Sequence, residues 1–176
     1  MEWIETTSGN RISRKAVILG ATNILLAGNT TIAASVSLNG DVRLNSASNK
    51  ISIQIGKHSL IGPSSEIWPP IIGFKRTKTK AKRVHGTSKI GSFTIISKNC
   101  VVKSINIGNR VLIEKNCYIG NLSIVYDNVV IKKNSCIPDK FIIPPFSYVY
   151  GKPPNLVVES LPVSFKNIIE RKAREL

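Results

Sequence analysis

Few residues in this chain of 176 are suited to catalysis or metal binding. It has two histidines and three cysteines, and without a C-x-x-C pair these predict neither a disulfide framework nor a zinc knuckle. The default expectation is therefore an intracellular, reducing location. No apolar run approaches the ~18 residues of a membrane span, and the opening MEWIETTSGN lacks the apolar region of a signal peptide.

Acidic residues are scarce: 10 Asp and Glu stand against 25 Lys and Arg, which gives a formal charge of +15 and a pI of about 10.1. Such a balance favours acidic partners, namely nucleic acid, an anionic membrane or an acidic protein surface. With 42% hydrophobic residues and a mean hydropathy of +0.05, the chain is expected to be one soluble globular domain with a substantial core.

Isoleucine or valine recurs every sixth residue through the second half of the chain, with a single step of five. Leucine and isoleucine continue the frame upstream, through 26–44 and 55–67. The repeat occupies Ile90, Ile96, Val102, Ile107, Ile113, Ile119, Val125, Ile131, Ile137, Ile143 and Val149, preceded by Leu26, Ile32, Leu38, Leu44, Ile55, Ile61 and Ile67.

The other positions of each hexad are consistent with a short strand and a corner. The residue four after an anchor is nearly always small or β-branched, and asparagine, which readily takes left-handed backbone angles, recurs three after the anchor. Three such strands closing a triangle predict an all-β, parallel β-helix of about seven coils, ~4.8 Å apart. The corner asparagines are Asn99, Asn116, Asn128 and Asn134.

The sequence divides into an N-terminal segment (1–16), the β-helix (17–151) and a C-terminal linker and helix (152–176). In the last part Ser164 is a candidate helix cap, and the apolar face that follows is expected to cover the open edge of the last coil. Within the β-helix, a basic loop at 68–89 interrupts the repeat. Its six clustered charges are Lys75, Arg76, Lys78, Lys80, Lys82 and Arg83.

Three interpretations of the basic loop stay open. Such a cluster is typical of a nuclear-localisation or nucleic-acid patch, and it also suits anionic lipid headgroups. The third interpretation is a mobile, solvated loop without a dedicated ligand. Beyond Phe74, which directly precedes the cluster, no aromatic residue is interleaved with the charges, and this argues against base stacking.

The hexads resemble those of the hexapeptide-repeat superfamily, and the resemblance implies a left-handed β-helix. That superfamily includes acyltransferases and the zinc-dependent gamma-class carbonic anhydrases. The R-G-D of the latter becomes Asn39, Gly40 and Asp41 here, and Lys98 and Lys103 stand where zinc ligands belong. Since that family uses three histidines and ammonium groups repel zinc, no metal, cofactor or catalytic residue is expected.

The remaining reactive side chains have structural explanations. His58 lies three after Ile55, at a predicted corner, and His85 lies in the basic loop. The alternative function is a hexapeptide-repeat acyltransferase with one of these histidines as general base, or a degenerate gamma-carbonic-anhydrase-like protein. Cys100 and Cys117 fall at the small inward position, where a buried apolar thiol is expected.

Residues 3–32, WIETTSGNRISRKAVILGATNILLAGNTTI, resemble the amino-terminal segment of the dynactin subunit five family, and IIPPFSYVYGKPP at 142–154 agrees with it. The resemblance implies a non-catalytic scaffold and adaptor at the pointed end of dynactin, in the cytoplasm and cytoskeleton. Its implied partners are dynactin subunit six (a paired β-helix), the pointed-end actin-related protein, dynactin subunit four and endosomal cargo adaptors for dynein, with no specific nucleic acid.

The chain departs from that family in KRTKTKAKRVHGTSK (75–89), which replaces an apolar, aromatic stretch. We hypothesise that its charge meets an acidic surface in the assembly. Two other classes compete: a homotrimeric hexapeptide-repeat enzyme with a ligand pocket between prisms, and a free-standing binder of anionic membrane or nucleic acid. The affinity of such a binder falls steeply with salt.

Overall fold

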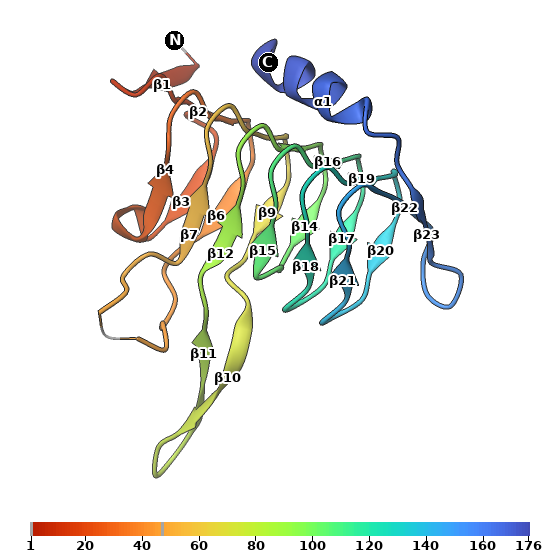
Figure 1. Cartoon of the computed structure of the whole chain (residues 1–176). Helices are drawn as coiled ribbons and strands as arrows, with labels where there is room; N and C mark the ends of the chain where they lie inside the picture. Colours follow the sequence, from red (N-terminus) through yellow and green to blue (C-terminus); the bar gives the residue numbers. More distant parts are fainter. Residues whose placement is uncertain (1, 47) are drawn as a thin grey trace.

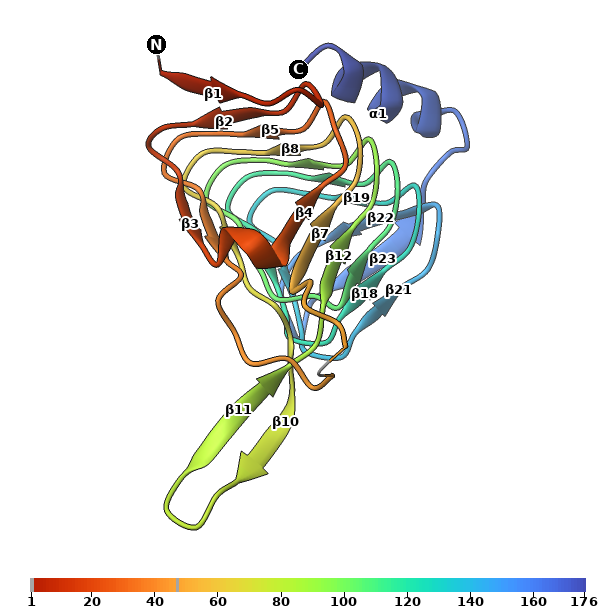
Figure 2. The same ribbon diagram turned by 90° about the vertical axis from the view of Figure 1, so that its left-hand side faces the viewer.

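Three parallel sheets form the sides of a triangular prism. The computed structural model describes residues 2–46 and 48–176. The chain visits the three sheets in turn, so strands one coil apart lie side by side (Figure 1 and Figure 2). This left-handed β-helix, with one helix near the C-terminus, confirms the predicted fold class.

The first sheet is the longest, because antiparallel strands extend it at both ends. Its strands, in spatial order, are β1 (Trp3–Glu5), β2 (Arg11–Ser13), β5 (Thr31–Ile32), β8 (Leu60–Ile61), β13 (Ile95–Ile96), β16 (Leu112–Ile113), β19 (Val130–Ile131), β22 (Ser147–Tyr150) and β23 (Val157–Ser160).

The other two sheets are wholly parallel. The second contains β3 (Val17–Leu19), β6 (Ser37–Asn39), β9 (Glu66–Ile67), β14 (Val101–Val102), β17 (Tyr118–Ile119) and β20 (Cys136–Ile137). The third contains β4 (Ile24–Leu26), preceded by the 3-10 turn Ala21–Asn23, and then β7 (Ile53–Ile55), β12 (Ser88–Ile90), β15 (Asn106–Ile107), β18 (Ile124–Val125) and β21 (Ile142–Ile143).

Each coil takes one strand from each sheet, so the six strands of the third sheet mark six complete coils, and β22 begins a seventh. The first coil includes β2, which pairs in parallel with β5. The prism therefore extends ahead of residue 17, where the hexad pattern had its expected start. Ile12 and Ile18 pair in register with Ile32 and Leu38, so they are anchors of the first coil. The step from Ile18 to Leu26 is eight residues because the 3-10 turn lies between them, and the six-residue frame traced back from Leu26 therefore did not reveal them.

Columns of isoleucine and valine fill the interior, as the hexads predicted. In the first sheet Ile61, Ile96, Ile113, Ile131 and Val149 pair in register from coil to coil. Each of these five side chains is 0% exposed. Full burial of such a side chain stabilises the fold by roughly 1.5–3 kcal/mol.

The corners take left-handed backbone angles. Asn99, Asn116 and Asn134 have φ of 58°, 61° and 62°, and His58 has φ of 52°. The three asparagine side chains also form a ladder, since each Nδ2 donates to the Oδ1 of the next, at 3.2 and 3.1 Å. Both the asparagine corners and the corner role of His58 are confirmed.

A second segment outside the coils was missed. Leu44 is not a coil anchor, because residues 41–46 and 48–51 form a loop outside the coils between β6 and β7. Leu44 instead forms an isolated bridge with His85, whose amide donates to the Arg43 carbonyl at 2.8 Å. The coil resumes at Ser52, whose amide donates to the Asn23 carbonyl of the preceding coil at 2.8 Å. Leu44 lies six residues after the anchor Leu38 by chance, in a loop that packs on the segment around His85.

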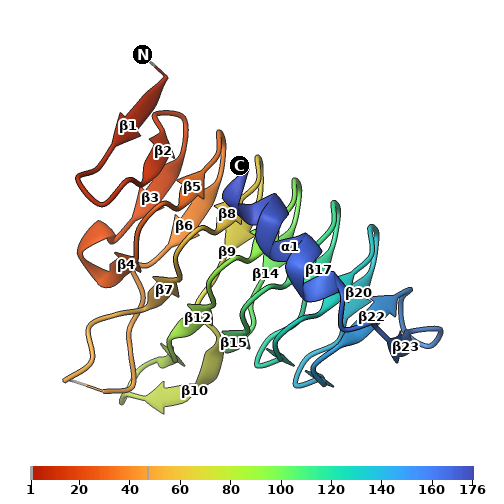
Figure 3. The same ribbon diagram turned by 45° about the horizontal axis from the view of Figure 1, so that its top comes forward.

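The last coil is covered by a strand and not, as the sequence predicted, by the C-terminal helix. β23 pairs with β22, whereas α1 (Phe165–Arg174) lies across the coils along one side of the prism (Figure 3). Its Ile169 and the preceding Leu161 pack on Val130, so α1 does not cover the last coil's open edge. Ser164 makes no side-chain cap hydrogen bond. Within residues 2–46 and 48–176, no helix has the length and apolar character of a membrane span.

Candidate functional site

The basic loop is an ordered two-stranded hairpin. β10 (Ile71–Arg76) pairs antiparallel with β11 (Ala81–His85), with a bulge near Gly73. Thr77 closes the turn, because its amide and its hydroxyl both donate to the Lys80 carbonyl, at 3.0 and 2.8 Å. We call residues 71–85 the basic hairpin. It projects from the corner between the second and third sheets (Figure 1).

The base of the basic hairpin is fixed to the prism. Asn121 accepts from the Ile71 amide at 2.8 Å and donates to the Ile71 carbonyl at 2.9 Å. The Asn121 amide in turn donates to Asp139 Oδ1 at 2.7 Å. On the other strand, His85 Nδ1 lies 3.0 Å from the Pro69 carbonyl oxygen. A rigid base therefore holds the tip away from the coils.

The six predicted charges lie together on the basic hairpin, and all six side chains are exposed. Lys75 is directly opposite Lys82, and like charges in such a pair are destabilising. Among the described residues, the ion pairs join other arginines to Glu5, Glu170 or Glu175 and include no hairpin side chain. The positive charge of the basic hairpin is therefore left uncompensated.

Acidic side chains elsewhere bind backbone amides at the corners of the prism. Asp127 Oδ1 accepts from the Asn109 amide at 2.8 Å, and Glu114 Oε2 accepts from the Lys133 amide at 2.9 Å. These carboxylates are held by the coils and lie away from the basic hairpin. Some of the few negative charges of the protein therefore stabilise its own coils.

A cavity of about 460 Å³ lies between β10 and the coils. Phe74, Lys103, Tyr118 and Asn121 are among its lining residues, and the Lys103 ammonium lies 5.5 Å from the centre of the Tyr118 ring. Phe74 is 67% exposed. The sequence did not indicate that Asn121, Lys103 and Tyr118 lie beside the hairpin, because their positions in the hexads are generic and only the fold brings them there.

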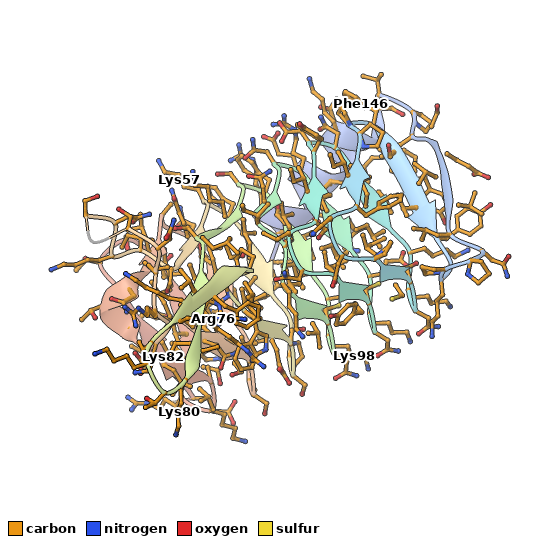
Figure 4. The ribbon with its side chains drawn as sticks, turned by 90° about the horizontal axis from the view of Figure 1, so that it is seen from below. Lys57, Arg76, Lys80, Lys82, Lys98 and Phe146 are labelled. Carbon is orange, nitrogen blue, oxygen red and sulfur yellow. The ribbon has the colours of Figure 1, made fainter. Side chains whose placement is uncertain are left out.

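Figure 4 places the hairpin tip relative to the prism. Lys80 and Lys82 lie toward the same edge of the prism as Lys98, whereas Lys57 and Phe146 lie along the opposite edge. Lys98 is an exposed side chain next to the asparagine ladder. Lysines therefore lie on both of these edges, and the hairpin tip lies toward the edge that carries Lys98.

The residues considered for catalysis occupy separate structural positions. The His58 ring stacks on Phe93, with centroids 5.2 Å apart and planes 6° apart. Asn39 is buried and donates to the Ile67 carbonyl at 3.3 Å. Within residues 2–46 and 48–176, no three His, Cys, Asp or Glu side chains lie close enough together to hold a metal ion.

Cys100 and Cys117 are buried in one column, as predicted. Their thiols donate to the carbonyls of Glu114 and Lys132, each at 3.2 Å. The hydrogen bond between the two side chains, followed by burial, raises the pKa of Cys117 above its ordinary value. A thiol held neutral in this way acts as a small core side chain.

Comparison with known proteins decides the family. The model of the family "Dynactin subunit 5" matches residues 1–173. The chain belongs to the dynactin subunit 5 family. A curated member, Dynactin subunit 5 of Dictyostelium discoideum, is 32% identical over 108 residues, which are 61% of this chain and 48% of that protein. The chain therefore spans about half the length of this curated relative.

Solved structures with the same fold include bacterial transferases. A hexapeptide transferase family protein from Anaplasma phagocytophilum has a TM-score of 0.65 at 13% identity, and the match covers 97% of this chain and 90% of that protein's chain. The acetyltransferase domain of PglB from Neisseria gonorrhoeae has a TM-score of 0.52 at 10% identity, and the match covers 88% of this chain and 58% of that protein's chain. At such identities the likeness shows the left-handed β-helix alone.

Proposed function

We propose that this member of the dynactin subunit 5 family is a non-catalytic scaffold and adaptor of the dynactin pointed-end complex, supporting dynein-driven cargo transport on microtubules. The observation that carries the proposal is the family match over residues 1–173. The proposed location is the cytoplasm and its cytoskeleton. The proposed partners are dynactin subunit six, the pointed-end actin-related protein, dynactin subunit four and endosomal cargo adaptors.

The prism suits a scaffold because it is rigid and flat-sided. α1 lies along one side, while the second and third sheets carry exposed apolar side chains. On the third sheet these are Leu25 (46% exposed), Ile142 (57%) and, at its edge, Tyr126 (48%). A typical protein interface buries about 800 Å² per partner, which one flat face can supply. A rigid surface also loses little conformational entropy on binding.

The basic hairpin is the second contact element of this proposal. Its six exposed basic side chains, without acidic partners in the described residues, form an electrostatic docking site for an anionic partner. Such a site increases association rates and sets orientation, and it is sensitive to salt. Docking requires no reaction at the site.

An acyltransferase is the alternative function, favoured by the fold shared with the Anaplasma hexapeptide transferase family protein. That alternative predicts a homotrimer that binds an acyl carrier between prisms. His58 would be the base at issue in this case, yet its ring lies against Phe93. The scaffold role predicts instead a heteromeric assembly and no such ligand.

Affinity purification of the tagged full chain from its native cells tests the proposal. Recovery of actin-related and other dynactin subunits supports it, whereas a homotrimer without them favours the enzyme and contradicts it. Ile142→Glu places a charge on the third sheet and is expected to lower recovery if that face docks. Lys98→Glu, at the corner between the first and second sheets and so away from the third sheet, is the control for an added carboxylate.

A further inference from the structure

The residue types of the basic hairpin indicate which anionic partner it fits. Between Lys75 and Arg83 there are four lysines and two arginines, separated only by threonine and alanine. Lysine is depleted in protein–protein interfaces, and interface hot spots are rich in tryptophan, tyrosine and arginine. Clusters of four to eight lysines and arginines, by contrast, are typical of segments that bind anionic lipid headgroups.

The shape of the hairpin supports the same partner. The charges lie on both faces of the ribbon and in its turn, since Lys75 and Lys82 share one face and Arg76 and Arg83 share the other. This arrangement offers no concave site for a single carboxylate. It suits a broad, diffuse layer of negative charge, which also relieves the repulsion between Lys75 and Lys82.

An exposed aromatic side chain accompanies the charges. Phe74 is 67% exposed and lies directly opposite Arg83, on the face that also carries Arg76. Phenylalanine beside basic residues is the pairing by which interfacial segments enter the boundary between headgroups and acyl chains. Phe74 also lines the cavity between β10 and the coils, and the exposed part of its side chain is the apolar surface that a membrane would cover.

We propose that the basic hairpin docks the protein on an anionic lipid surface. This inference deepens the proposed docking role of the hairpin and names a membrane, where the sequence hypothesis named an acidic protein surface of the assembly. The base contacts of Asn121 and His85 keep the hairpin projecting, so the prism faces stay free for protein partners while the tip contacts the membrane.

Flotation of the purified full chain with vesicles tests the inference, using phosphatidylcholine with and without phosphatidylserine. Each Lys or Arg near an anionic surface changes partitioning roughly fivefold, so replacing all six by glutamine is expected to lower binding by at least about a hundredfold. Phe74→Ser is expected to lower binding by roughly tenfold with the charge unchanged. Binding by the wild type is expected to fall as salt rises.

The matched control replaces six exposed lysines outside the hairpin by glutamine and so removes the same charge. These are Lys15, Lys57, Lys89, Lys98, Lys115 and Lys133. Retained binding by this control, with loss in the hairpin variant, supports the proposal. Equal loss in both variants would assign binding to net charge and overturn it.

Two further outcomes separate this inference from the proposed function. Absence of wild-type flotation with phosphatidylserine vesicles overturns the lipid proposal, even if dynactin subunits still co-purify with the tagged chain. If the hairpin variant also loses those subunits, the hairpin binds an acidic protein surface, as the sequence hypothesis held. If the wild type floats with the vesicles but no dynactin subunits co-purify with the tagged chain, the lipid proposal is supported and the scaffold role is contradicted.

Discussion

The prism and the basic hairpin are built by the same kind of pairing with opposite consequences. In the prism, register places isoleucine on isoleucine, as at Ile96 and Ile113, and each such contact buries apolar surface. In the hairpin, register places Lys75 on Lys82 in water, where the pair repels. The comparison teaches that the paired side chains of the prism stabilise it, whereas those of the hairpin repel each other and gain from an external anion.

The largest expected effect comes from removing one interior side chain. Ile113→Ala in the middle of the first sheet is expected to lower the free energy of unfolding by about 2–5 kcal/mol, because removal of this side chain leaves a cavity in the buried column. Lys115→Ala, an exposed change two residues away, is expected to stay within about 0.5 kcal/mol. Urea unfolding of both variants measures the difference, and similar losses would contradict the columnar core.

The second effect concerns the junction between the two regions. Asn121→Ala removes both hydrogen bonds to Ile71 and leaves its half-buried backbone groups without these partners, an expected loss of about 1–3 kcal/mol at the base of the hairpin. Amide exchange at Ile71 should therefore accelerate. Asn109→Ala is the control, because Asn109 Oδ1 likewise accepts from a backbone amide, that of Ser92 at 2.8 Å, without contacting the hairpin. Equal acceleration in both variants would argue against a specific anchor.

The smallest effect tests the repulsion itself. Lys82→Glu turns the cross-strand pair with Lys75 into an attractive one and is expected to stabilise the hairpin by roughly 0.2–1 kcal/mol. Lys80→Glu, in the turn, changes the charge equally without creating that cross-strand pair. Amide exchange of the hairpin at low and high salt compares them. The gain from Lys82→Glu should shrink as salt screens the pair, and a salt-independent gain would contradict an electrostatic cause.

The sequence predicts the prism well because its core is periodic. Each buried anchor, such as Ile96 or Val125, occupies the same environment as its neighbours, so spacing alone identifies it. Corner residues are equally local, since a left-handed backbone favours asparagine wherever it occurs. Leu44 shows the limit: it continues the spacing by one step, yet its environment is a loop.

The hairpin and the helix were harder to predict because distant residues position them. The charge cluster was visible, but Asn121, which binds Ile71 across 50 positions of sequence, decides how the hairpin stands on the prism. Likewise, Ile169 of the helix packs on Val130 at the side of the prism and does not pack on the edge of the last coil. Such packing depends on coils that only the folded chain brings together.

Amide hydrogen exchange of the full chain, with and without phosphatidylserine vesicles, tests most directly the division between a self-sufficient prism and a hairpin that needs an anion. The account predicts slow exchange at Ile96, Ile113 and Ile131 in both conditions, and slowing of residues 75–83 only with the vesicles. Unchanged exchange at 75–83, or protection gained chiefly by the coils, would contradict it.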